Sequence, residues 1–144
     1  MATRKVRLRI ITPEQIKVDE DVDRVIMRCT TGDMGILPGH EAYSTTLNYG
    51  VLRILAGGVE RRIAVYGGLA TIQNNVLTIL TIGAEWPEDI DRLHAEADRE
   101  HAERRLQERT DDIEIQHDQV LLRRALVQIE VCSYSPTSED ERVK

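Results

Sequence analysis

Hydrophobic and polar residues alternate along the first part of the chain. Residues 5–12 place Val6, Leu8 and Ile10 on one face, with basic residues between them, and residues 24–30 repeat the pattern. A period of two is typical of a strand with one buried face. Short apolar runs predict further strands at residues 51–55, 59–66, 69–73 and 76–82.

Turn-forming residues separate these runs. Gly57-Gly58, Gly67-Gly68 and Asn74-Asn75 tolerate the positive φ of hairpin turns. Residues 32–40 hold three glycines and a proline, which excludes a helix and predicts an irregular loop. Because no helix separates the strands, we expect an antiparallel sandwich or barrel over residues 1–86.

The pattern changes at Trp86-Pro87. Residues 88–109 lack Gly and Pro, which predicts a helix, and a capping box formed by Asp111 and Glu114 predicts a second. The predicted apolar stripes are Ile90, Leu93, Ala97, Ala102 and Leu106 on the first helix, and Val120, Leu122, Ala125, Leu126 and Ile129 on the second. We expect an antiparallel two-helix hairpin over residues 87–132 and a disordered polar tail over 133–144.

The hairpin has little apolar surface to bury. Its alanine-rich seam contributes about 1 kcal/mol or less per buried methyl group. Such a hairpin can detach and rebind elsewhere, which suggests a conformational switch.

Composition excludes several classes of function. The net charge is −6 and aromatic residues make up 3% of the chain, which argues against binding to nucleic acid. No run of eighteen apolar residues exists, so we expect no insertion into a membrane. Cys29 and Cys132 lie far apart in the sequence and are expected to be reduced thiols.

No set of residues predicts catalysis or a cofactor. The glycine-rich loop lacks the Gly-Lys-Ser/Thr ending of a nucleotide-binding loop, because His40-Glu41 follows Gly39. His94, His101 and His117 lack the close spacing of zinc ligands, so no metal is expected. His40 follows a Pro-Gly bend, and either a loop-stabilising hydrogen bond or a partner contact would explain it.

Several strings of residues resemble the ε subunit family of bacterial F-type ATP synthases. They are the loop Gly35-Ile36-Leu37-Pro38-Gly39-His40, the strand Gly50-Val51-Leu52-Arg53-Ile54, Gly67-Gly68, Val76-Leu77-Thr78-Ile79-Leu80 and the terminal Arg123-Arg124-Ala125-Leu126. The resemblance runs in collinear order over about residues 5–131. It implies an all-β sandwich of about ten strands followed by the helical hairpin.

The resemblance also implies a role without catalysis. Such a subunit belongs to the central-stalk rotor, binds the γ subunit and the c-ring, and lies at the cytoplasmic face of the bacterial membrane as a peripheral protein. The implied partner-binding residues are Asp33, Ile36, Pro38 and His40. The hairpin would regulate ATP hydrolysis against the catalytic α/β subunits, with Asp91, Arg123 and Arg124 as regulatory residues.

One motif departs from relatives that bind ATP on the hairpin. Their Ile/Leu-Asp-x-x-Arg-Ala motif reads here Ile90-Asp91-Arg92-Leu93-His94-Ala95, with His94 in place of the arginine. Three further arginines of those relatives fall at His101, Arg124 and Gln128. Because neutral side chains cannot give the charged contacts that phosphates favour, we expect no ATP cofactor.

Two alternatives compete with this interpretation. A general β-sandwich adaptor with a coiled-coil arm would form a stable dimer through the hairpin, whereas the ε resemblance predicts co-purification with γ. A small sandwich hydrolase would need a convergent catalytic set, which the sequence does not offer.

Overall fold

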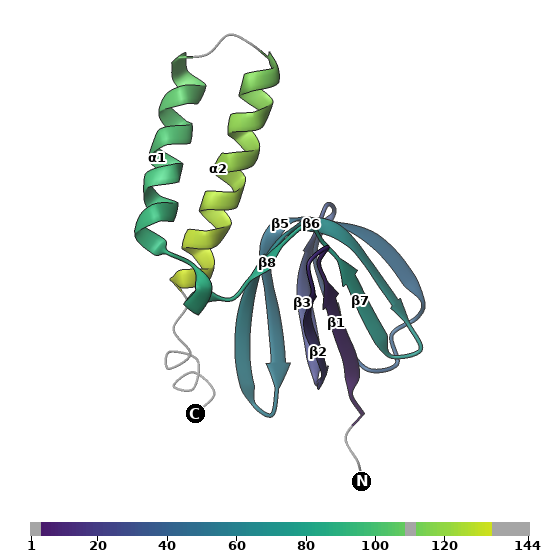
Figure 1. The fold of residues 1–144 in the computed structure, drawn as a ribbon. Coiled ribbons are helices and arrows are strands. Elements are labelled where there is room, and N and C mark those ends of the chain that lie inside the picture. Colours follow the sequence, from purple (N-terminus) through teal and green to yellow (C-terminus); the bar gives the residue numbers. More distant parts are fainter. Residues whose placement is uncertain (1–3, 109–111, 134–144) are drawn as a thin grey trace.

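A computed structural model describes residues 4–108 and 112–133. Asp111 of the capping box and the predicted tail, except for Ser133, lie outside this part. Its strands are β1 (Val6–Ile11), β2 (Ile16–Val22), β3 (Arg24–Cys29), β4 (Gly32–Ile36), β5 (Tyr43–Ala56), β6 (Val59–Gln73), β7 (Val76–Leu80) and β8 (Ala84–Glu85). A 3-10 turn, η1 (Pro87–Asp89), leads to α1 (Arg92–Glu108) and α2 (Asp112–Cys132). The predicted class, a β-sandwich followed by a helical hairpin, is confirmed (Figure 1).

The sandwich forms around two long curved strands. The sheet order is β2-β1-β7-β6-β5-β3-β4, and β8 pairs with β6. Residues 69–73 of β6 pair with β7, and residues 53–55 of β5 pair with β3. The long β5–β6 pair therefore belongs to both layers (Figure 1). The alternating apolar residues meet between the layers in one core, which includes Leu8, Met27, Ile54 and Ile79.

Three details differ from the sequence-based prediction. The described residues form eight strands instead of about ten. One of the missing boundaries lies at Gly67-Gly68, where a turn was predicted and β6 continues instead. Both glycines have positive φ, and a Cβ on Gly68 would lie 2.0 Å from the Leu80 carbonyl oxygen. The β1–β7 pair is parallel, not antiparallel. The first half of the predicted 32–40 loop is strand β4, which pairs with β3.

Two predicted hairpin turns are confirmed. Gly57 and Gly58 join β5 to β6, and Asn74 and Asn75 join β6 to β7. All four residues have positive φ, which explains why glycine and asparagine occupy these positions.

The two helices stand side by side at one end of the sandwich (Figure 1). We call the helical hairpin the arm. The first helix begins at Arg92 and not at Glu88, because Ile90 adopts an extended conformation between η1 and α1. Within residues 4–108 and 112–133, no helix combines the length and the apolar character that crossing a membrane requires.

The predicted apolar stripes of the arm are partly wrong. Leu93 is 78% exposed, and Val120 and Leu126 are also exposed. Ala102 and Ala125 of the predicted stripes are buried as expected, and so is Ala95, which the stripes did not include, so the helices meet through small residues. Alanines bring the helices close together, so the larger side chains beside them stay at the solvent side or turn towards the sandwich.

Candidate functional site: the loop after β4 and the arm–sandwich interface

Three hydrogen bonds hold the loop after β4, one to Asn75 and two within the loop. The Gly39 N–H donates to Asn75 Oδ1 at 2.6 Å, and the His40 N–H donates to the Leu37 carbonyl at 3.2 Å. His40 Nδ1 lies 2.7 Å from the Glu41 carbonyl oxygen. Because a carbonyl oxygen only accepts, Nδ1 carries the proton, and a neutral His40 ring keeps Nε2 as an acceptor.

The predicted contact residues of this loop differ in accessibility. The Asp33 side chain is 67% exposed and lies 3.7 Å from Arg28 Nε. Pro38 and His40 are half-buried, and Leu37 is 54% exposed. Ile36 has no exposed surface, because its side chain belongs to the sandwich core, so it supports the loop and cannot itself touch a partner. Leu37, which the sequence analysis did not select, offers the accessible apolar side chain.

The arm contacts the sandwich through a small apolar cluster. Val127 and Val131 of α2 pack on Val51, Ala64 and Tyr66 of β5 and β6. Two groups of polar contacts flank this cluster. We call the three together the arm–sandwich interface.

Glu85 is the centre of the first polar group. Its Oε1 accepts hydrogen bonds from the Tyr66 hydroxyl at 2.5 Å, Gln128 Nε2 at 3.2 Å and Arg124 Nη2 at 3.4 Å. The Arg124 guanidinium also lies 4.8 Å from the centroid of the Tyr66 ring. Burial tends to raise the pKa of Glu85, but these donors and the Arg124 charge outweigh it, so the pKa lies below its ordinary value. Burial, followed by the Glu85 contact, raises the pKa of Tyr66.

The second polar group joins β3 to the end of α2. Arg28 Nη1 and Nη2 donate to the two Glu130 carboxylate oxygens at 3.2 and 3.1 Å, a bidentate pair. The Glu130 hydrogen bonds are the main reason that the pKa of Arg28 is raised. Because Arg28 also faces Asp33, one guanidinium lies between the arm and the strand before the loop.

The residues of the degenerate ATP motif have structural roles at the start of α1. Asp91 Oδ1 accepts from the His94 N–H at 3.2 Å, so Asp91 is the N-cap of the helix. Ile90 packs on the apolar cluster of the arm–sandwich interface, and Ala95 is buried between the helices. The His94 side chain is 74% exposed and lies 3.4 Å from Asp98.

The remaining predicted residues do not come together. Arg123 is exposed on α2, whereas its neighbour Arg124 lies in the arm–sandwich interface. Within the described residues, no three potential metal ligands form a group, and His94, His101 and His117 are all exposed.

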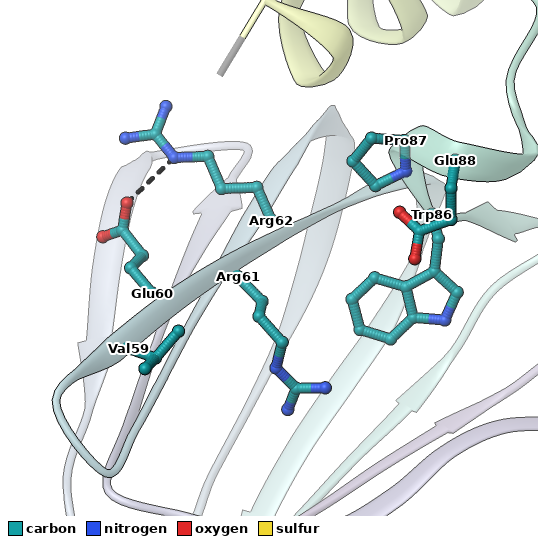
Figure 2. A pocket seen from close by; sticks show the side chains of 7 residues that line it. All are labelled: Val59, Glu60, Arg61, Arg62, Trp86, Pro87 and Glu88. Atoms are coloured by element: carbon teal, nitrogen blue, oxygen red, sulfur yellow. Dashed lines mark hydrogen bonds and ion pairs between the residues drawn. The ribbon is translucent and has the colours of Figure 1, made fainter. Parts of the chain in front are cut away.

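A groove of about 290 Å³ lies between the start of β6 and the linker to α1. Figure 2 shows its lining, Val59, Glu60, Arg61, Arg62, Trp86, Pro87 and Glu88. Arg62 Nε donates to Glu60 Oε2 at 3.0 Å, and the Arg61 guanidinium lies 5.4 Å from the Trp86 ring. Both arginines are engaged within the sandwich, Arg61 with Glu20 and Arg62 with Glu60.

Comparison with known proteins assigns the family. Residues 5–87 match the family model described as "ATP synthase, Delta/Epsilon chain, beta-sandwich domain", and residues 88–133 match "ATP synthase, Delta/Epsilon chain, long alpha-helix domain". The chain belongs to the ATP synthase delta/epsilon family. Together the two matches cover the sandwich and the arm.

Individual relatives agree with this family. The chain is 38% identical over 119 residues to the ATP synthase epsilon chain of Caldicellulosiruptor saccharolyticus, covering 83% of this chain and 87% of that protein. It is 36% identical to the epsilon chain of Bacillus velezensis over 126 residues, covering 88% and 96% of the two chains. A chain in the mitochondrial ATP synthase of Euglena gracilis, solved with OSCP, F1 and c-ring, is similar at a TM-score of 0.79 and 25% identity, covering 90% of this chain and 82% of that one.

Proposed function

We propose that the chain is a non-catalytic rotor subunit in the central stalk of an F-type ATP synthase. Its sandwich would bind the γ subunit and the c-ring and transmit rotation between the ring and the catalytic head, driven by protons or sodium ions. The match of both parts of the chain to the delta/epsilon family supports this role, as does the similar chain in an assembly that contains F1 and the c-ring. The subunit would be peripheral, at the cytoplasmic face of a bacterial membrane.

The loop after β4 is the proposed contact with the c-ring. Asp33, Pro38 and His40 stay in the proposed contact set, and Leu37 replaces the buried Ile36 as its apolar member. The hydrogen bonds from Gly39 and His40 hold the loop in one shape before a partner arrives, which lowers the entropy cost of binding.

Crosslinking in the assembled synthase tests this contact. An Asp33→Cys variant, in a background with Cys132 replaced by Ser, should crosslink to the c-ring. Asp21→Cys is the matched control, because Asp21 is also an acidic strand residue and its side chain is 60% exposed. In the assembled complex the control cysteine at position 21 should react freely with a bulky maleimide, and the cysteine at position 33 should not. If the cysteine at position 33 also reacts freely, the loop lies elsewhere.

The arm is the proposed regulator of ATP hydrolysis, in contact with the catalytic α/β subunits when it opens. The observation that carries this proposal is the size of its attachment: the apolar cluster around Val127 and Val131, the Glu85 group and one exposed ion pair hold it to the sandwich. So small an attachment can be exchanged for another surface at low cost. Arg123, exposed on α2, is available to acidic partners in both states.

A truncation tests how the two parts divide the work. A chain ending at Trp86 should still assemble with γ and the ring, because the sandwich has its own core. It should lose the arm's effect on hydrolysis. Failure of this truncated chain to assemble would contradict the proposed division.

ATP is proposed to play no strong role in this regulation. Arg124, the cation that is kept, already contacts Glu85 and Tyr66, and the Gln128 amide donates to the same carboxylate. His94 points into solvent. A triphosphate at this place would have to displace these contacts while gaining few charged ones.

A further inference from the structure

Asp118 lies inside the arm, between its two helices. Its residue surface is 0% exposed, although it is a carboxylate in a two-helix hairpin. Neither of its oxygens has a hydrogen-bond partner among the described residues. Within the described residues its counter-charge is Arg105, whose Nε lies 3.6 Å from Asp118 Oδ1, too far for a hydrogen bond.

The rest of the contact between the helices does little to compensate. Arg99 Nε is also buried without a hydrogen-bond partner in the described part of the chain. The fully buried apolar residues facing across the helices are the alanines Ala95, Ala102 and Ala125, which bury little surface each. We call the arm closed when its two helices are in contact and open when they are apart. The closed arm therefore encloses charge and gains little from hydrophobic burial.

We propose that Asp118 is a built-in weak point that sets how readily the two helices of the arm separate. The inference rests on the proposed function, in which the arm opens. In the closed arm the carboxylate loses water and receives one ionic contact at 3.6 Å in return. In the open arm it is hydrated again. The residue therefore favours opening, while Arg105 limits that tendency.

Asp118→Leu should close the arm. The variant removes the buried charge, and Arg105, whose side chain is 33% exposed, can reach water once its partner is gone. Because apolar side chains in place of buried charges of similar size are often stabilising when no charge is left buried, the ratio of closed to open arm should rise by about tenfold or more. Asp118→Asn, which removes the charge and keeps the shape, should shift the ratio in the same direction by less. His117→Leu is the matched control: it adds the same side chain one position away on the exposed surface of α2 and should change nothing.

Arg105→Met should act in the opposite direction. It leaves the Asp118 carboxylate buried without a counter-charge, so the open population should rise by about tenfold or more. In the double variant, Asp118→Leu should cancel this effect and restore the closed arm. The double variant keeps the test measurable even if the unmodified arm is closed almost all of the time.

The ratio is measured on the full chain by electron-spin resonance distances. Spin labels are attached to cysteines placed at the exposed Glu103 of α1 and Gln119 of α2, with Cys132 replaced by Ser. Trp86 fluorescence reports whether the sandwich stays folded. If Asp118→Leu opens the arm as Arg105→Met does, or fails to close the arm again in the double variant, the inference is wrong.

A separate measurement addresses the proposed function. ATP hydrolysis is assayed in synthase reassembled with each variant. If Asp118→Leu closes the arm in the distance measurement and hydrolysis does not respond, the inference about Asp118 stands and the proposed regulatory role fails.

Discussion

Val131 is the residue on which the docked arm depends most directly. It belongs to α2, is 0% exposed, and packs with Val127 on Tyr66, Val51 and Ala64 of the sandwich. It is not part of the main core between the sandwich layers. Val131→Ala should therefore loosen the arm and leave the sandwich intact.

The expected loss of docking free energy follows from the atoms that Val131→Ala removes. The substitution deletes two buried methyl groups, at about 0.8 kcal/mol per buried carbon. A small term for the space left behind brings the cost to about 2 kcal/mol. Because about 1.4 kcal/mol is a factor of ten, the undocked population should rise roughly 30-fold. Val127 is 5% exposed, so Val127→Ala should have a similar effect of the same sign.

Distance measurements between the arm and the sandwich give the undocked population. Labels at the exposed Asp21 of β2 and Gln119 of α2 report docking, and thermal unfolding followed by Trp86 fluorescence reports the sandwich. Val120→Ala is the matched control, because it removes the same two methyl groups from a residue of α2 that is 43% exposed. The control should change docking by less than about threefold.

Two outcomes would refute this reasoning. If Val131→Ala leaves docking unchanged, the valine cluster does not hold the arm and the polar contacts do. If it lowers the unfolding temperature of the sandwich as much as it undocks the arm, the two parts are one cooperative unit, and the arm cannot act as a separable switch.

Three further predictions concern single positions. Gly68→Ala should destabilise the sandwich by about 3 kcal/mol or more, because residue 68 has a φ of +120° and its new Cβ would meet the Leu80 carbonyl oxygen. Chemical denaturation measures this loss. Gly58→Ala is the control and should cost less, because the space around Gly58 is open. The pKa of Glu85 in the folded chain is below its ordinary value of 4.5. Its contribution to docking is therefore complete above about pH 4.5 and is lost as the pH falls through the folded pKa. Glu85→Gln should flatten this acid-induced undocking in the distance assay. Titration calorimetry of ATP into the chain should show no micromolar binding, since even two lost charged contacts weaken binding about a hundredfold or more, and micromolar binding would mean that His94 substitutes for the arginine.

Local chemistry in the sequence determined much of the fold. The alternation in β1 and β3 identified the buried faces, because side-chain direction in a strand depends only on neighbouring residues. The Gly57-Gly58 and Asn74-Asn75 turns were predictable for the same reason, since positive φ is a property of single residues. The change at Trp86-Pro87 separated the sandwich from the arm, because composition differs between a β core and a solvated hairpin.

Contacts between distant segments decided the rest. Gly67-Gly68 looks like a turn locally, and only the approach of Leu80 shows why glycine is needed inside a continuous strand. Ile36 resembled an exposed loop residue until its pairing with Val25 placed it in the core. The burial of Asp118 was invisible in the sequence, since a carboxylate in a charged helix is usually solvated.

The arm–sandwich interface belongs wholly to tertiary structure. Glu85 meets Gln128 across 43 positions, and Arg28 meets Glu130 across 102. No periodicity or local motif encodes such pairs, because they depend on where folding carries each segment. The sequence alone determined that the chain consists of a sandwich and a thinly apolar arm. Only the tertiary structure decided where the arm rests, which few contacts hold it there, and that its interior encloses a charge.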